Sequence, residues 1–158
     1  MIYLVRHAEA HDADRDELRE LTDRGKRVAE RLGQFLRQAR IVDAEVIWHS
    51  TLVRARQTAA LMGREMGISI LKEIKGLAPN DSPAAFARKL TAVRSDIVIV
   101  GHNPHLTALG TLLVKGEGAN LPAVEFPKCA ALALNNVGSG EPGEWCVAWH
   151  LSPAMLDA

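Results

Sequence analysis

Hydrophobic and polar residues alternate along this chain in two rhythms. Short, nearly continuous apolar runs at residues 1–6, 46–48 and 96–101 are typical of strands buried on both faces. A weaker strand is expected across residues 68–74. Stretches with an apolar residue every three or four positions separate these runs, as expected for amphipathic helices. The rhythm predicts an α/β fold, a three-layer sandwich with a mostly parallel central sheet and helices on both faces.

Residues suited to capping helices precede the helical stretches. The first helix is predicted over residues 23–38, with Thr22 as its N-cap. Ser50 is placed to cap a second helix and Ser82 a third. Asn103 is placed to cap a fourth, and both Ser82 and Asn103 are followed by a proline, which suits a first helical position.

The C-terminal third changes character. Two β-like runs, residues 129–134 and 145–151, are joined by a connector rich in Asn, Gly and Pro, which predicts a C-terminal β-hairpin. Trp145, Val147 and Trp149 alternate along the second run. Because alternate residues of a strand share a face, we expect all three in the core.

Composition narrows the classes of protein to consider. A chain of 158 residues suits one domain, residues 1–158. Nineteen basic and nineteen acidic residues give no net charge, so neither nucleic acid nor a membrane surface is an expected partner. No apolar run approaches membrane-spanning length, and Arg6 comes too early for a signal peptide, so a cytoplasmic protein is expected. Cys129 and Cys146 form no metal-binding or redox pair and are expected in the core.

Polar residues follow three of the predicted strands where each ends. They are Arg6 and His7 after the first strand, His49 with Arg54 a turn later after the second, and His102 and Asn103 after the fourth. Because the carboxyl ends of parallel strands meet at one edge, these residues should surround a single pocket. Guanidinium groups match phosphate oxygens, and nearby helix N-termini add donors. The pattern predicts a phosphate site; His49 is interpreted as structural.

Three motifs, in this order and spacing, resemble the histidine phosphatase superfamily. They are RHAEA at residues 6–10, STLVRARQT at 50–58 and VIVGHN at 98–103. The short chain and its opening motif are similar to the SixA-type phosphohistidine phosphatases. The resemblance implies a phosphoglycerate mutase-like fold, which agrees with the rhythm described above.

The resemblance also implies roles for individual residues. His7 matches the nucleophile that accepts the phosphoryl group, and Arg6 and Arg54 match the arginines that clamp it. His102 matches the second histidine at the phosphoryl oxygens, and Arg19 a further pocket arginine. We expect His7 to react as the neutral imidazole, with its other ring nitrogen donating to a carbonyl or carboxylate, and His102 to be protonated. No metal or other cofactor is expected.

One departure from the family pattern bears on the substrate. Gly76 stands where ester-hydrolysing members carry a glutamate that protonates the leaving alkoxide. An alcohol leaves poorly without an acid, whereas protonated phosphohistidine releases an imidazole, so P–N substrates are favoured. Glu9 or Asp81 could still supply a proton. The chain also lacks long insertions over the pocket, which favours a phosphorylated protein as partner, with a histidine-containing phosphotransfer domain implied by the resemblance.

Other interpretations remain at this stage. A phosphomonoesterase for a small metabolite would use Glu9 or Asp81 as its acid, and a phosphate-binding module would have no turnover. His102 and His105 have a spacing that could serve a metal, but the arginines would repel a cation. Arg56 and the charged residues 12–20 are interpreted as solvated, although a loop over the rim could contact substrate.

Overall fold

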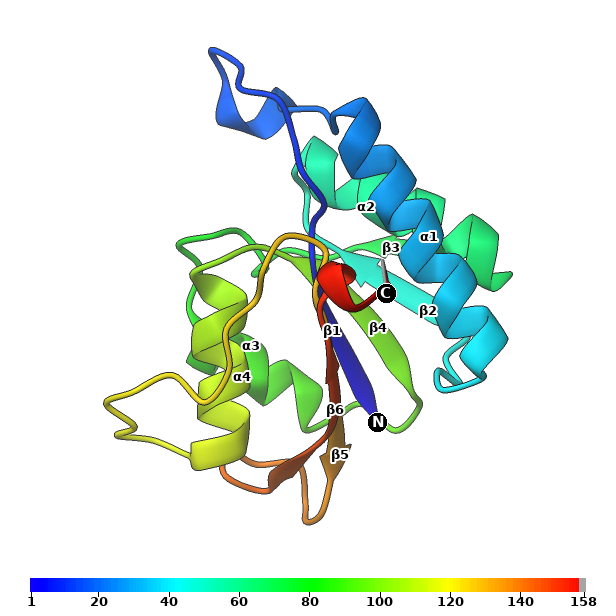
Figure 1. The fold of residues 1–158 in the computed structure, drawn as a ribbon. Helices are drawn as coiled ribbons and strands as arrows, with labels where there is room; N and C mark the ends of the chain where they lie inside the picture. The colour runs from blue at the N-terminus through cyan, green and yellow to red at the C-terminus, as the bar shows by residue number, and fades with distance from the viewer. Residues whose placement is uncertain (157–158) are drawn as a thin grey trace.

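A mixed six-stranded sheet forms the middle layer of the computed structural model, which describes residues 1–156 (Figure 1). Its strand order is β3-β2-β4-β1-β5-β6. The strands are β1 (Ile2–Arg6), β2 (Val46–His49), β3 (Ile70–Glu73), β4 (Ile97–Gly101), β5 (Ala131–Asn136) and β6 (Trp145–Leu151). Strands β3, β2, β4 and β1 run parallel, whereas β5 and β6 are antiparallel neighbours at one edge. The predicted α/β architecture and C-terminal hairpin are confirmed.

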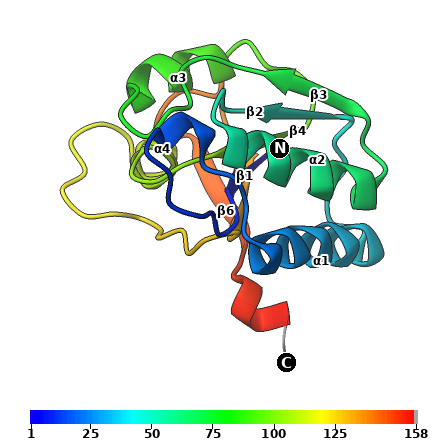
Figure 2. The same ribbon diagram turned by 90° about the horizontal axis from the view of Figure 1, so that it is seen from above.

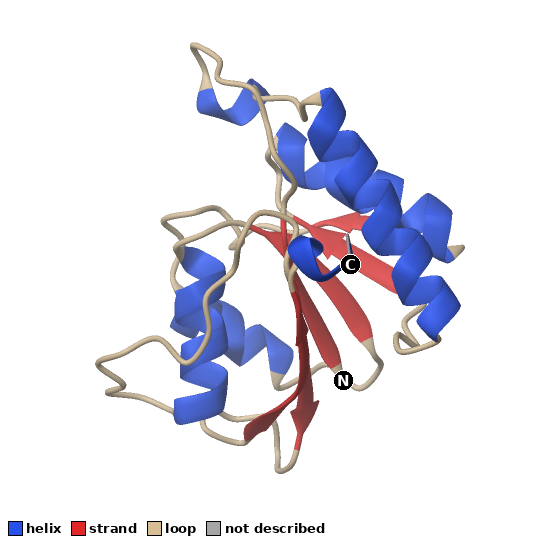
Figure 3. Cartoon of the chain, viewed as in Figure 1, coloured by secondary structure: helices blue, strands red, loops and turns tan. Residues whose placement is uncertain are grey.

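Two helices cover each face of the sheet (Figures 1 and 2). On one side lie α1 (Asp23–Ala39) and α2 (Val53–Met66), and on the other α3 (Pro83–Leu90) and α4 (His105–Lys115). Two short 3-10 turns, η1 (Asp16–Leu18) and η2 (Pro153–Leu156), complete the described helical elements (Figure 3). Among residues 1–156, no helix is both long and apolar enough to cross a membrane.

Strand β1 separates two hydrophobic clusters. Tyr3 and Val5 face the cluster under α1 and α2, and Ile2 and Leu4 face the cluster under α3 and α4. All four side chains are buried, which explains why the strand reads as a continuous apolar run and not as an alternating one. The core therefore holds the end of β1, where Arg6 and His7 follow, in a fixed position.

Two of the four expected helix caps are present. The Thr22 hydroxyl accepts a hydrogen bond from the Gly25 nitrogen at 2.9 Å, and Ser82 accepts one from Ala85 at 3.2 Å. The expectations for Ser50 and Asn103 are wrong, because α2 begins only at Val53 and α4 at His105. In both places the chain bends after the strand before it becomes helical, so the polar residue stays at the strand end.

The hairpin departs from simple alternation. A bulge pairs Ala133 with Trp149 but Leu134 with Val147, so one extra residue of β6 is inserted between them. Trp145 consequently packs in the cluster under α3 and α4, whereas Trp149 packs against the opposite cluster, and Val147 is 48% exposed. The expected shared face for these three residues is therefore wrong. Cys129 is buried as expected, but Cys146 is exposed.

Candidate active site

The carboxyl ends of three neighbouring strands place the predicted residues together. Arg6 on β1 is in register with Gly101 on β4, and His49 on β2 is in register with Val100. His7 and His102 therefore follow adjacent strands, and their ring centroids lie 5.0 Å apart. Arg54 enters from the first turn of α2. The strand order thus brings together the side chains from three separate parts of the sequence.

His7 is held in one tautomer. Its Nδ1 lies 2.7 Å from the carbonyl oxygen of Ala8, which can only accept, so Nδ1 carries the hydrogen and Nε2 the lone pair. The ring is only 6% exposed, and its backbone is fixed on both sides by hydrogen bonds with Gly101 and Cys129. Burial, followed by the charges of Arg54 and Arg6, lowers the pKa of His7 to about 4. His7 is therefore neutral, as expected, and its Nδ1 partner is a backbone carbonyl.

Arg54 contacts both the nucleophilic nitrogen of His7 and the loop after β1. Its side chain is almost fully buried, and its Nε donates to His7 Nε2 at 3.3 Å. Its Nη1 donates to the Asp16 carbonyl at 2.7 Å, and its Nη2 to Asp16 Oδ2 at 3.0 Å. Thr58, one helical turn later, donates to the Arg54 carbonyl at 2.7 Å. The guanidinium is thus fixed beside the lone pair of His7.

Arg6 and Asn103 are linked through the segment before β5. Arg6 Nη1 donates to the carbonyl of Phe126 at 2.8 Å, and Asn103 Nδ2 donates to the same oxygen at 3.2 Å. Within residues 1–156, the buried Arg6 Nε and both ring nitrogens of His102 have no hydrogen-bond partner. Buried polar groups usually find a partner, so unpaired donors beside His7 are suited to an incoming oxyanion.

His102 differs from expectation in its charge. The ring is 1% exposed, and burial, followed by the proximity of His7 and Arg54, lowers its pKa to about 3. His102 is therefore neutral in this structure and not protonated, chiefly because burial of its ring disfavours the charged form. As a neutral ring it can still donate one hydrogen bond to a phosphoryl oxygen.

Arg19 lies on the loop after β1, together with a residue that sequence reasoning did not single out. Arg19 Nε donates to the His11 carbonyl at 2.8 Å, and Nη1 donates to Asp16 Oδ1 at 3.2 Å. The charge of Arg19 helps to lower the pKa of His7, which places it near the site. The carboxylate of Asp16 bridges Arg19 and Arg54. Asp16 was not predicted because it lies among the charged residues 12–20, which were interpreted as solvated. Its position three residues before Arg19 was the one feature of the sequence that could have indicated it.

The two candidate acids are engaged in local structure. Glu9 accepts a hydrogen bond from the Thr22 hydroxyl at 2.9 Å, and Asp81 accepts one from the Ala78 nitrogen at 2.8 Å. His49 is buried, with its Nδ1 2.9 Å from the Ser50 carbonyl, which fits a structural role, and Arg56 is exposed. No cluster of three or more metal-ligating side chains is found within the described part of the chain.

The fold and the site together define an α/β protein that surrounds a neutral histidine with arginines. The family model of the histidine phosphatase superfamily (branch 1) matches residues 2–77, which include His7, Arg19 and Arg54. The chain is thus similar to this superfamily over residues 2–77. Comparison of the sequence with curated proteins finds no match.

Solved structures agree over nearly the whole chain. The protein histidine phosphatase SixA, solved with tungstate, has 24% identity and a TM-score of 0.87, with 98% of each chain covered. A protein assigned as the phosphohistidine phosphatase SixA of Agrobacterium tumefaciens has 28% identity and a TM-score of 0.77, covering 96% of this chain and 97% of that one. A protein assigned likewise in Nakamurella multipartitia has 27% identity and a TM-score of 0.77, covering 96% and 95%. The chain has the phosphoglycerate mutase-like fold of SixA.

Proposed function

We propose that this phosphatase removes the phosphoryl group from phosphohistidine on a protein, through a phospho-His7 intermediate and without a metal. The observation that carries the proposal is the fixed tautomer of His7. Its Nδ1 is bonded to the Ala8 carbonyl at 2.7 Å, and its Nε2 lies 3.3 Å from the Arg54 guanidinium. A neutral ring with its lone pair directed at a phosphate-binding group is arranged for nucleophilic attack.

In the first step, His7 Nε2 attacks the phosphorus atom and the bond from phosphorus to the substrate imidazole breaks. Charge on the equatorial oxygens is stabilised by Arg6 and Arg54, with Arg19 adding positive charge at the rim and the amide of Asn103 supporting Arg6 through the shared Phe126 carbonyl. Neutral His102 donates one hydrogen bond. These fixed cations do the work that a metal ion does in other phosphatases.

In the second step, a water oxygen attacks the phosphorus of phospho-His7, the bond from phosphorus to His7 Nε2 breaks with its electron pair returning to the nitrogen, and the phosphate leaves with the protons of the water shared between it and the solvent. The ring of His7 then returns to the Nδ1-protonated tautomer, because the Ala8 carbonyl accepts a hydrogen bond only from that form. The same hydrogen bond is retained while Nε2 carries the phosphoryl group. The Ala8 carbonyl therefore orients His7 in both halves of the reaction.

Substrate type follows from the leaving group. Asp81 is bonded within its own turn and Glu9 to Thr22, so neither is positioned as a free acid for an alkoxide. Protonated phosphohistidine releases a neutral imidazole without such an acid. The SixA proteins of similar fold are histidine phosphatases by name, which supports a protein substrate, with a histidine-containing phosphotransfer domain of a cytoplasmic signalling relay as the partner we propose.

Phosphate release from a histidine-phosphorylated phosphotransfer protein, measured in excess chelator, tests this proposal. The native protein is compared with His7→Ala and with His11→Ala, which removes an exposed histidine of the neighbouring loop. An alkyl phosphomonoester is run in parallel, and alkaline quenching traps a phosphoenzyme. We expect release that survives chelation, needs His7 and not His11, and exceeds ester turnover.

Other results would change the function. Ester hydrolysis that depends on His7 and exceeds phosphohistidine turnover would identify a phosphomonoesterase acting on small metabolites. Binding of phosphate without turnover of either substrate would identify a binding module. Activity lost in chelator and restored by one added metal would contradict a reaction driven by arginines alone.

A further inference from the structure

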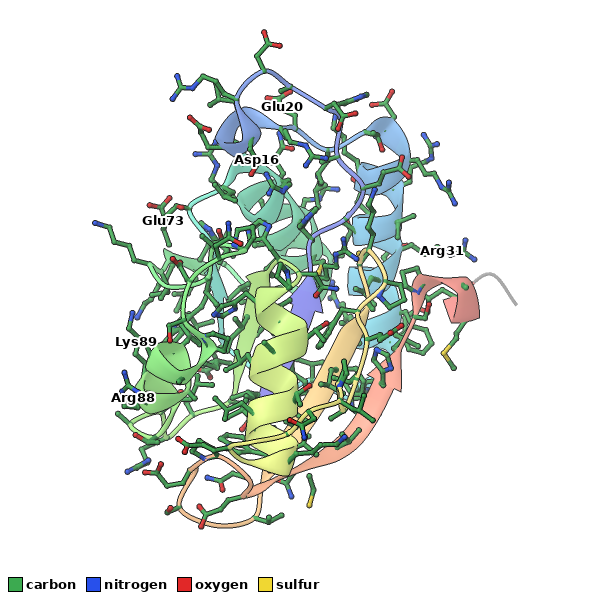
Figure 4. All side chains as sticks on the ribbon, turned by 90° about the vertical axis from the view of Figure 1, so that its left-hand side faces the viewer. Asp16, Glu20, Arg31, Glu73, Arg88 and Lys89 are labelled. Atoms are coloured by element: carbon green, nitrogen blue, oxygen red, sulfur yellow. The ribbon has the colours of Figure 1, made fainter. Side chains whose placement is uncertain are left out.

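The carboxylate of Asp16 contacts two arginines of the site and is open to solvent. Its Oδ1 accepts from Arg19 Nη1 at 3.2 Å and its Oδ2 accepts from Arg54 Nη2 at 3.0 Å. The side chain is nevertheless 59% exposed. Figure 4 shows it on the loop after β1, beyond the ends of the strands. A group that approaches the two arginines from solvent therefore meets this carboxylate.

Asp16 is an acceptor and not a donor in the neutral pH range. Partial burial acts to raise the pKa of Asp16, but the hydrogen bonds from Arg54 and Arg19 outweigh it and hold the pKa below its ordinary value. The carboxylate is thus ionised when the enzyme works. It cannot protonate a leaving alkoxide, yet it can accept a hydrogen bond from the N–H of a cationic phosphoimidazole.

His7 and Asp16 bind different nitrogens of one guanidinium. Arg54 Nε faces the nucleophilic nitrogen of His7, whereas Nη1 and Nη2 face Asp16. A phosphoryl group bound to Arg54 would then lie close to the nucleophile at the Nε side of the guanidinium and close to the carboxylate at its Nη side. In-line transfer puts the leaving atom on the side of phosphorus opposite the nucleophile, so a contact between the leaving group and Asp16 requires that side to face the carboxylate.

We infer that Asp16 determines specificity for P–N over P–O substrates by accepting a hydrogen bond from the ring N–H of the protonated phosphoimidazole, from which the imidazole leaves. The inference rests on the proposed function. A phosphorylated imidazole carries phosphorus on one nitrogen and a proton on the other when cationic. As the bond from phosphorus breaks, its electron pair stays on the first nitrogen, so neutral imidazole departs with the proton still on the second. A nearby negative charge stabilises the cationic form and so increases the reactive fraction.

The test compares kcat/KM for phosphoimidazole and for p-nitrophenyl phosphate, an ester whose leaving group needs no acid. The variants are Asp16→Asn, Asp16→Glu and Asp14→Asn, the last removing one negative charge from the same exposed loop. We expect Asp16→Asn to lower the ratio of phosphoimidazole to ester activity by about tenfold or more, a loss of about 1.4 kcal/mol in transition-state stabilisation. Asp16→Glu should recover part of the ratio, and Asp14→Asn should leave it unchanged.

Two results would overturn this inference and leave the proposed function intact. If Asp16→Asn lowers both activities equally, Asp16 only positions Arg54 and makes no contact that distinguishes an imidazole from an ester leaving group. If it raises both equally, the carboxylate competes with the phosphoryl group for the arginines. Absence of His7-dependent turnover of phosphoimidazole in the native protein, with ester turnover intact, would instead overturn the proposed function together with this inference.

Discussion

The Thr58 hydroxyl accepts a hydrogen bond from the backbone nitrogen of Ala8 at 3.1 Å. It also donates to the Arg54 carbonyl at 2.7 Å, so a single buried side chain connects α2 to the residue after the nucleophile. The Ala8 carbonyl in turn holds His7 Nδ1. The tautomer of His7 and the position of Arg54 therefore depend on the same hydroxyl, 50 residues from Ala8 in the sequence.

Thr58→Val should impair both the fold and the reaction. The substitution keeps the shape of the side chain but leaves the buried nitrogen of Ala8 without an acceptor, which costs about 1–3 kcal/mol of unfolding free energy. Misplacement of His7 against Arg54 should lower kcat by about tenfold or more, with a smaller change in KM. Urea unfolding and steady-state kinetics measure the two effects.

Thr58→Ser is the matched control because it retains the hydroxyl. It should recover most of kcat and fall well short of the stability loss of Thr58→Val. Equal kcat values for native protein and Thr58→Val would show that the hydroxyl has no positioning role.

Much of the fold could be predicted because burial leaves a direct mark on the sequence. Strand β1 lies between two pairs of helices, so all of Ile2 to Val5 are apolar. The residues at strand ends were also predictable, since buried parallel strands bring their carboxyl ends to one edge. Arg6, His7, Arg54 and His102 are close together for this reason.

The remaining features depend on tertiary contacts that the local pattern does not contain. The β6 bulge moves Trp145 and Trp149 to opposite faces, and nothing in their spacing reveals the inserted residue. The sequence around Asp16 is that of a solvated, charged loop. Its role depends on a hydrogen bond from Arg54, which is 38 residues away in the sequence. The charge of His102 depends on how deeply the ring is buried, which no motif gives.

The neutral state of His7 should be visible by NMR titration. Burial and neighbouring arginines lower its pKa to about 4, so its ring protons should keep the shifts of neutral imidazole from pH 8 to about pH 5. Free imidazole in the same sample serves as the reference. A midpoint near the ordinary histidine value of about 6.5 would contradict the assignment of a neutral nucleophile at moderate acidity.

Stability should fall on mild acidification because His7 and His102 stay neutral when folded. Their pKa values are lowered to about 4 and about 3, so between these values and about 6.5 the unfolded chain binds protons that the folded chain does not. The free energy of unfolding therefore drops as pH decreases through this window. The loss from pH 7.5 to pH 5 should be about 2 kcal/mol for each histidine.

Urea unfolding at the two pH values measures this loss. His102→Gln should reduce the difference because one titrating ring is gone. Measurements at pH 8.5 and 7.5 provide the baseline, since both histidines are then neutral in the folded and unfolded states. An equal drop in native protein and His102→Gln would assign the acid sensitivity to other groups.

Gly76 should resist substitution because of its backbone. Its φ of 97° lies in a region that residues with a side chain rarely adopt, whereas a Cβ placed there would meet Lys89 and Phe86 only at ordinary contact distances of 3.4 and 3.5 Å. The cost of Gly76→Ala should therefore be the backbone strain alone, about 1–2 kcal/mol, and Gly76→Glu should cost a similar amount. Gly67→Ala calibrates this cost, since Gly67 has a φ of 79° and no atom within 4 Å of the added Cβ. Thermal unfolding of the three variants measures the effect, and native stability in Gly76→Glu would show that the backbone at this position accepts a side chain without strain.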